Sequence, residues 1–90
     1  MVQDVEIFVS LLSELLSDLK TDENESKLSN IAHNTKKLLE FLQEEEDYLY
    51  VQIILNRMIK LRDKYEKCGS SHLIMHTLIY EVFVIYSSKL

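Results

Sequence analysis

The side chains best able to do chemistry are a histidine pair late in the chain and a single cysteine. His72 and His76 are four positions apart, so they lie on one face of a helix with the spacing of a metal-binding pair. A zinc site needs three or four ligands, and neither Cys68 nor Glu81 completes an obvious set with them. A surface or half-buried histidine pair is the favoured interpretation, and we predict no metal ion and no cofactor.

The remaining reactive side chains do not form a catalytic arrangement. His33 belongs to no nucleophile–base motif, and the sequence has no glycine-rich phosphate loop. Side chains of the acidic run Glu44–Asp47 point in different directions around a helix, so their carboxylates do not converge on one site. Small helical-bundle enzymes such as chorismate mutases need several inward Arg and Lys residues, which Arg57 and Arg62 alone do not supply. The sequence therefore predicts a protein that is not an enzyme.

Length, composition and charge narrow the class of protein further. The chain has 90 residues, 47% of them apolar, with one glycine and no proline. Because β-sheet proteins need turn residues at many positions, we expect helices throughout. The net charge of −5 argues against nucleic acid as a partner, since phosphate binding normally uses a basic patch. A single cysteine, no signal peptide and no apolar run of ~18 residues favour a cytoplasmic protein.

Apolar residues recur at spacings of three and four in four segments, which predicts helices over residues 4–20, 23–43, 47–67 and 71–88. Short connections between them predict an all-α, antiparallel up-and-down four-helix bundle that forms one domain over residues 1–90. The predicted core face of the first helix comprises Val5, Phe8, Leu12, Leu15 and Leu19, widened by Leu11 and Leu16. That of the second comprises Leu28, Ile31, Thr35, Leu38 and Leu42, widened by Ala32 and Leu39, with Asn34 facing water. The third presents Val51, Ile54, Leu55, Met58, Leu61 and Tyr65.

Residues typical of helix ends separate these segments. The N-cap candidates are Asp4 for the first helix, Asp22, Asn24 or Ser26 for the second, and Ser70 or Ser71 for the fourth. Gly69 stands just past the predicted third helix, where a left-handed residue is favoured. We predict a break at Glu44–Asp47, because the apolar stripe changes phase there and acids favour the start of a helix over its end.

The last segment, Ser71 to Leu90, is too apolar for a surface helix with one apolar stripe. Its core face is predicted to be Met75, Leu78, Ile79, Val82, Ile85 and Tyr86. Further apolar residues fall on its flanks and back, namely Leu73, Ile74, Tyr80, Phe83 and Val84. A strand is set aside because no other segment offers it a partner. Either the other helices enclose this one, or an exposed apolar strip docks onto a partner.

Several stretches of the chain are similar to a known family. They are LLSELLSDLK (Leu11 to Lys20), the loop TDENESKL, IAHNTKKLLEFL (Ile31 to Leu42) and ILNRMIKL (Ile54 to Leu61). Leu55-Asn56-Arg57-Met58 is the most suggestive piece. With these stretches the chain resembles, over roughly Phe8 to Ile85, the immunity proteins of pediocin-like (class IIa) bacteriocins, especially the enterocin A immunity group. It differs from that pattern in having no Pro or Gly between the second and third helices.

The resemblance implies a protein that protects a producing cell from its own bacteriocin without catalysis. Such proteins act inside the cell on the bacteriocin's receptor, a membrane permease of the mannose phosphotransferase type, and peripheral membrane association would fit this role. The C-terminal half of the family sets which bacteriocin is countered. On this hypothesis Lys60, Arg62 and Lys64 steer the protein to an acidic or membrane-proximal surface, and Tyr80, Phe83 and Val84 make the contacts.

A second hypothesis needs no bacteriocin. The chain would be a cytosolic helical interaction or regulatory module, and two copies would form a homodimer through their fourth helices. Dimer interfaces resemble a domain core cut in half, which suits the composition of this segment. The sequence alone leaves both hypotheses open, together with monomer or homodimer as the state in solution. A metal-binding protein comes third.

Overall fold

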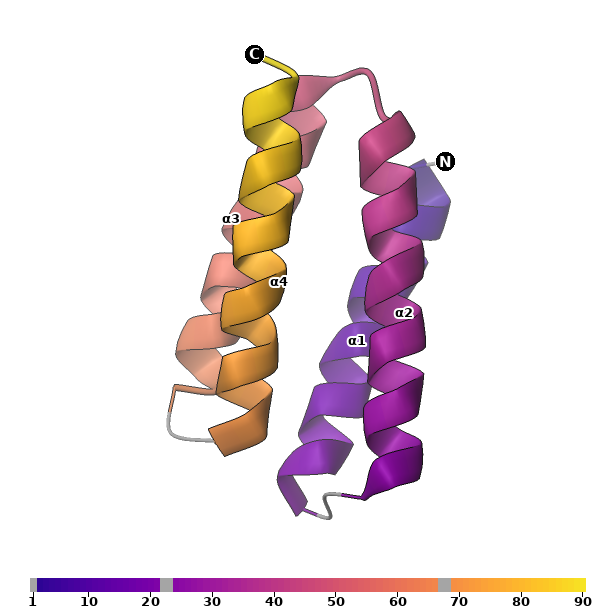
Figure 1. Cartoon of the computed structure of the whole chain (residues 1–90), viewed down its shortest axis with the longest axis vertical. Coiled ribbons are helices and arrows are strands. Elements are labelled where there is room, and N and C mark those ends of the chain that lie inside the picture. Colours follow the sequence, from indigo (N-terminus) through magenta and orange to yellow (C-terminus); the bar gives the residue numbers. More distant parts are fainter. Residues whose placement is uncertain (1, 22–23, 67–68) are drawn as a thin grey trace.

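A computed structural model describes residues 2–21, 24–66 and 69–90, and within these ranges it contains helices and no strand. The helices are α1 (Val2–Thr21), α2 (Glu25–Glu44), α3 (Tyr48–Lys64) and α4 (Gly69–Ser88). Consecutive helices run in opposite directions (Figure 1). The predicted all-α four-helix bundle is therefore confirmed, with boundaries that differ from the prediction by a few residues.

Two helical hairpins stand side by side in the bundle. α1 packs closely against α2, and α3 against α4, while α2 lies beside α4 at the front of the view in Figure 1. At the back, α1 and α3 are joined by side chains, because Arg57 pairs with Glu6 and the Tyr65 hydroxyl donates to the Ser13 carbonyl over 3.3 Å. α4 makes substantial contact with each of the other three helices. It is thus the helix through which the two hairpins are chiefly held together.

The core lies along the axis between the two hairpins and draws on all four helices. Each helix contributes apolar side chains that are almost fully shielded from solvent, including Leu12, Leu38, Ile54, Met58 and Val82. The predicted core face of α3 is confirmed except for Leu61, which is half-buried. The bundle interior is therefore mainly aliphatic.

The break between α2 and α3 is also confirmed. α2 ends at Glu44, and Glu45 takes an extended conformation with ψ of 123°. Asp47 is the N-cap of α3, and its carboxylate accepts from the Leu49 and Tyr50 amides over 3.0 and 3.4 Å. At the start of α2, Asn24 is the cap, accepting from the Lys27 amide over 2.9 Å. The alternative Asp22 lies outside the described residues.

Other predictions of helix ends were wrong. α1 begins at Val2, so Asp4 lies inside the helix, because one cap residue contributes only about 1 kcal/mol and does not by itself stop a helix. α3 ends at Lys64 with Tyr65 as its C-cap, three residues before the predicted end. Gly69 has the left-handed φ of 39° expected of it, yet it is the first residue of α4. Ser70 and Ser71 therefore lie within α4 and not before it.

The buried face of α1 is rotated from the predicted one. Val9 and Leu16 are buried on it, Phe8 and Leu15 are half-buried, and Leu11 is 40% exposed. This rotation turns Val9 and Leu16 towards the centre of the bundle while keeping Phe8 in contact with α2. The centroid of the Phe8 ring lies 5.5 Å from the centroid of the Phe41 ring.

Asn34 was predicted to face water and is in fact 2% exposed. It comes three residues after Ile31 and four residues before Leu38, and this spacing puts it on the same inward face of α2 as these two apolar residues. Its side-chain amide donates to the Phe8 carbonyl over 2.9 Å, which ties α2 to α1. Its side-chain oxygen is buried without a hydrogen-bond partner in the described part of the chain. Of the two polar atoms of this buried side chain, only the nitrogen therefore has a hydrogen-bond partner among the described residues.

Removing the cap of α3 should destabilise the bundle measurably. Asp47→Ala leaves the first amides of α3 without an acceptor, and we expect the free energy of unfolding to fall by about 1 kcal/mol. For a domain of this size the corresponding fall in Tm is about 4–8 °C in a thermal melt followed by circular dichroism. The control is Glu46→Ala, an exposed acid next to the cap, which should leave Tm nearly unchanged. Equal shifts in the two variants would contradict the assignment of Asp47 as the cap.

Candidate interaction surface

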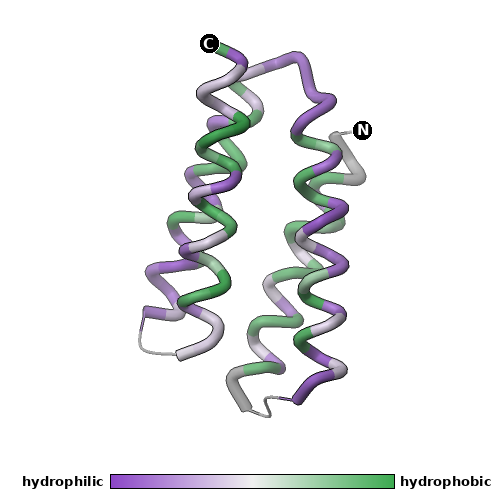
Figure 2. The backbone as a smooth tube through the Cα atoms, in the orientation of Figure 1, coloured by the Kyte–Doolittle hydropathy of each residue, from purple (hydrophilic) through white to green (hydrophobic). Residues whose placement is uncertain are grey.

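α4 has one buried face and one exposed face, and both carry mostly apolar side chains. The buried face comprises Ser71, Met75, Leu78, Val82 and Ile85. On the opposite side Leu73 is 65% exposed, Tyr80 69%, Phe83 54% and Val84 50%, and we call these four residues the outer face of α4. Figure 2 shows the difference in composition: green predominates over purple along α4, whereas purple and green alternate along α2. The interpretation in which the other three helices enclose α4 is therefore wrong for the protomer.

The outer face is large for a chain of this size. At ordinary side-chain areas the four exposed fractions amount to roughly 450 Å² of apolar surface, comparable with functional patches on monomeric proteins. The segment Gly69–Ser88 carries only one charged residue, Glu81. Aromatic side chains make good anchors because they bury much area while ordering few torsions. The geometry therefore favours contact with another molecule.

The structure places the predicted contact residues together and two of the three predicted steering residues elsewhere. Tyr80, Phe83 and Val84 share the outer face of α4. Lys60 and Lys64 instead line a groove of about 460 Å³ between α1 and α3. Ser10 and Ser13 line the opposite wall of that groove. Lys60 and Lys64 thus lie on a different side of the molecule from the apolar strip.

The individual basic side chains make only weak contacts. Arg62 is half-buried and its Nε lies 3.6 Å from the Asp63 carboxylate. The ammonium of Lys64 lies 5.6 Å from the centre of the Tyr65 ring. Such contacts at the surface contribute little to stability, so these charges remain available to shape the field around the protein.

A polar cluster between α1 and α3 was not predicted from the sequence. The Glu6 carboxylate pairs with Arg57 and accepts a long hydrogen bond of 3.5 Å from the Tyr50 hydroxyl. Burial raises the pKa of Tyr50 above its usual value, and the nearby Glu6 carboxylate raises it further. Because Glu6 is far from both partners in the sequence, no local spacing could have revealed the cluster. Its contacts position α1 against α3.

The histidines do not form a metal site with other described residues. The rings of His72 and His76 are nearly parallel, with centroids 6.4 Å apart, and His33 is exposed on α2. Within residues 2–21, 24–66 and 69–90, no group of three or more His, Cys, Asp or Glu side chains is arranged to hold a metal ion. Cys68 lies outside these ranges. The Nδ1 atom of His72 is buried and has no hydrogen-bond partner among the residues that the structure describes.

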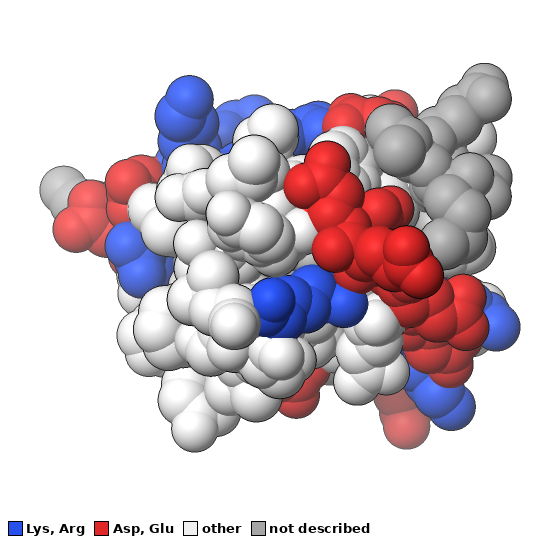
Figure 3. Space-filling view, turned by 90° about the horizontal axis from the view of Figure 1, so that it is seen from above, with Lys and Arg blue, Asp and Glu red and all other residues white. Residues whose placement is uncertain are grey.

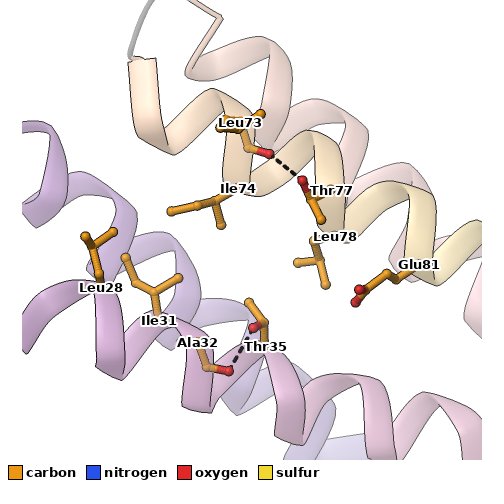
Figure 4. Close-up of a pocket in the computed structure, with 9 residues that line it drawn as sticks. All are labelled: Leu28, Ile31, Ala32, Thr35, Leu73, Ile74, Thr77, Leu78 and Glu81. Carbon is orange, nitrogen blue, oxygen red and sulfur yellow. Dashed lines mark hydrogen bonds between the residues drawn. The ribbon is translucent and has the colours of Figure 1, made fainter. Parts of the chain in front are cut away.

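A groove between α2 and α4 is a second feature that the sequence did not reveal (Figure 4). It has a volume of about 380 Å³. Ala32 and Thr35 line it from α2, while Leu73 and Thr77 line it from α4. The helical periodicity placed Leu73 outside the core but could not show which neighbouring helix it would stand beside. The groove adjoins the outer face of α4 through this residue.

Charge is distributed unevenly around the bundle. The acidic run Glu44–Asp47 joins α2 to α3 at the end of the molecule seen in Figure 3. Acidic side chains form a band there beside a broad uncharged area. The Lys89 ammonium donates to the Gln43 carbonyl over 2.9 Å and fastens the end of the chain to the end of α2. This end of the protein is therefore negative, and the outer face of α4 is not.

The chain matches no protein-family model, no curated protein and no solved structure. Across the described residues, none of the helices combines the length with the apolar character that crossing a membrane requires.

Replacing the outer-face aromatic residues should leave the fold intact. In the double variant Tyr80→Ser and Phe83→Ser, exposed rings are exchanged for a residue of similar helix propensity. We expect the free energy of unfolding in urea to change by no more than about 1 kcal/mol in total. Met75→Ala, at a fully buried position on the same helix, should cost about 2–5 kcal/mol. A loss in the double variant as large as in Met75→Ala would show that the outer face is structural.

Proposed function

We propose that this chain is an immunity protein of the pediocin-like bacteriocin class. It would protect the producing cell by binding, from the cytosolic side, the membrane permease that the bacteriocin uses as its receptor. No catalytic step is involved in this proposal. The protein would act by occupying a surface of the permease–bacteriocin complex, with the outer face of α4 as its own contact surface.

The sequence resemblance supports the proposal through residues that have clear places in the bundle. The stretches Leu11–Lys20, Ile31–Leu42 and Ile54–Leu61 lie in α1, α2 and α3. In the most suggestive piece, Leu55 and Met58 are buried in the core and Arg57 pairs with Glu6. The similar residues therefore mainly hold the bundle together. Residues elsewhere in the chain would have to recognise the partner.

The outer face of α4 is the single observation that carries the proposal. It offers two aromatic anchors, Tyr80 and Phe83, on a rigid helix in the C-terminal half of the chain. Burying them against a partner removes apolar area from water and requires little ordering of the protein. Lys60 and Lys64 are too far around the bundle to join this contact, so they would act through the long-range field within about 10 Å of the surface.

Expression in a sensitive strain tests the proposed function. Cells that carry the wild-type protein should survive a pediocin-like peptide that kills cells without it. The double variant Tyr80→Ser and Phe83→Ser should lose this protection, because the loss of two anchors weakens partner binding by roughly tenfold or more. The matched control is Ile7→Ser with Leu11→Ser, which removes two exposed apolar residues from α1 and should retain protection.

Two results would count against this function. Survival unchanged by the wild-type protein, across a panel of pediocin-like peptides, would remove the immunity proposal. Equal loss of protection in the α1 and α4 double variants, with both proteins present at wild-type levels, would remove the assignment of the contact to α4.

A second candidate function is a helical interaction module that dimerises through α4. One observation favours it: exposed positions on α4 follow the alternating three and four spacing of a coiled-coil seam. These positions are Leu73, His76, Tyr80, Phe83 and Ser87. The seam carries no acidic residue, so two copies of a chain with net charge −5 can meet there without like charges in direct contact.

Light scattering at micromolar protein concentration separates the two candidates. A dimerising module should have twice the protomer mass, and Tyr80→Ser with Phe83→Ser should return it to a monomer, because the interface is near the lower size limit of stable dimers. A wild-type monomer at these concentrations would contradict the module. A monomer that also protects cells would favour immunity.

A further inference from the structure

The groove between α2 and α4 extends along much of both helices. One hollow, of about 380 Å³, is lined by Leu28, Ala32 and Thr35 of α2 together with α4. A second, of about 400 Å³, is lined by Leu39 and Gln43 of α2 together with α4. From Leu28 to Gln43 the α2 backbone rises about 22 Å, which is the length of a helix of about 15 residues.

The two threonine hydroxyls that line the groove are already satisfied. The Thr35 hydroxyl donates to the Ala32 carbonyl over 2.9 Å, and the Thr77 hydroxyl donates to the Leu73 carbonyl over 3.0 Å (Figure 4). Both threonines therefore have their donors occupied by their own helix. The walls then offer methyl and methylene groups to an occupant, which favours apolar side chains.

Among the described residues, Glu81 is the one charged side chain that lines the groove, and it lines both hollows. It makes no ion pair or hydrogen bond with any residue that the structure describes. A carboxylate in the middle of an apolar groove favours an occupant with a cation at the matching place and disfavours one with an anion there. The net charge of −5 acts in the same direction at longer range.

We infer that this groove binds an amphipathic helix of a partner protein. Three or four apolar side chains of that helix, at spacings of three and four, enter the two hollows, and a Lys or Arg between them pairs with Glu81. Leu73, Tyr80 and Val84 form the edge of the groove on the α4 side, so part of the outer face of α4 belongs to the same contact. The inference deepens the proposed function, on which it rests for the partner's biological role, and gives the chemistry of the bound segment.

Other occupants fit the groove less well. The exposed apolar residues of α1, Ile7 and Leu11, stand among Glu6 and Glu14, so a second copy entering with this face would bring carboxylates towards Glu81. A second copy entering with α4 would bring its own Glu81. A fatty acid would likewise carry an anion. A basic amphipathic helix offers apolar side chains to the walls of the groove and a cation to the Glu81 carboxylate, so it fits the groove better than the other occupants.

A pair of synthetic peptides tests the inference on the purified full chain. Each has about 15 residues, the length of the groove. Each carries Leu at spacings of three and four on one face and Gln and Ala elsewhere, and the two differ only in a central Lys or Glu. Binding is measured by titration of ¹⁵N-labelled protein, which also shows where the peptide lies. We expect the Lys peptide to perturb amides on facing sides of α2 and α4 and to bind about fivefold tighter than the Glu peptide.

Two charge variants make the test specific to Glu81. Glu81→Lys should reverse the order of the two peptides. Glu14→Lys changes the net charge by the same amount at an exposed site on α1 and should leave the order unchanged. Ala32→Glu places a carboxylate on the exposed α2 wall of the groove and should weaken binding of both peptides without lowering Tm, since Ala32 is exposed.

Three results would overturn the inference. They are no perturbation by either peptide, perturbations that lie outside the α2–α4 groove, or equal effects of Glu81→Lys and Glu14→Lys. The cell assay is separate from this one. Protection without peptide binding removes only the groove, and peptide binding without protection removes only the immunity role.

Discussion

The bundle depends on one helix packing against all the others. α4 contacts α1, α2 and α3, and it does so with a single narrow face centred on Met75, Leu78 and Val82. A helix buries only the part of its surface that its neighbours reach, and three short helices cannot surround a fourth and also bury their own apolar faces. The apolar residues on the far side of α4 are therefore left in contact with water. The exposed strip follows from the architecture and the composition of α4 together.

Polar contacts with α1 help to fix how the two hairpins meet. The Ser71 hydroxyl, on the buried face of α4, donates to the Leu16 carbonyl over 3.3 Å, and Arg57 of α3 pairs with Glu6. Directional contacts of this kind select one arrangement among several that an aliphatic core would allow. A fixed arrangement also helps to define the width of the groove between α2 and α4, because Ser71 ties α4 to α1 and Asn34 ties α2 to α1. The shape of the groove at the surface thus depends on polar contacts between the helices.

The sequence predicted the fold class and the break at Glu44–Asp47, because apolar spacing and stripe phase are local properties of the chain. It also placed Leu73, Tyr80, Phe83 and Val84 off the core face of α4, and the structure confirms this. It missed the inward turn of Asn34, since a single polar residue between apolar ones looks the same whether it faces water or a backbone carbonyl. The α2–α4 groove and the pairing of Glu6 with Arg57 depend on which helices become neighbours, and helical periodicity carries no information on that choice.

The central claim is that the isolated protomer exposes the outer face of α4 to solvent. The most direct test is the relaxation that a soluble nitroxide adds to the methyl signals of the dilute protein. The Leu73 and Val84 methyls should relax strongly, and the Leu78 and Val82 methyls of the same helix should be shielded. If all four are shielded alike, the outer face is covered within the protein, and the account of α4 as a binding surface is wrong.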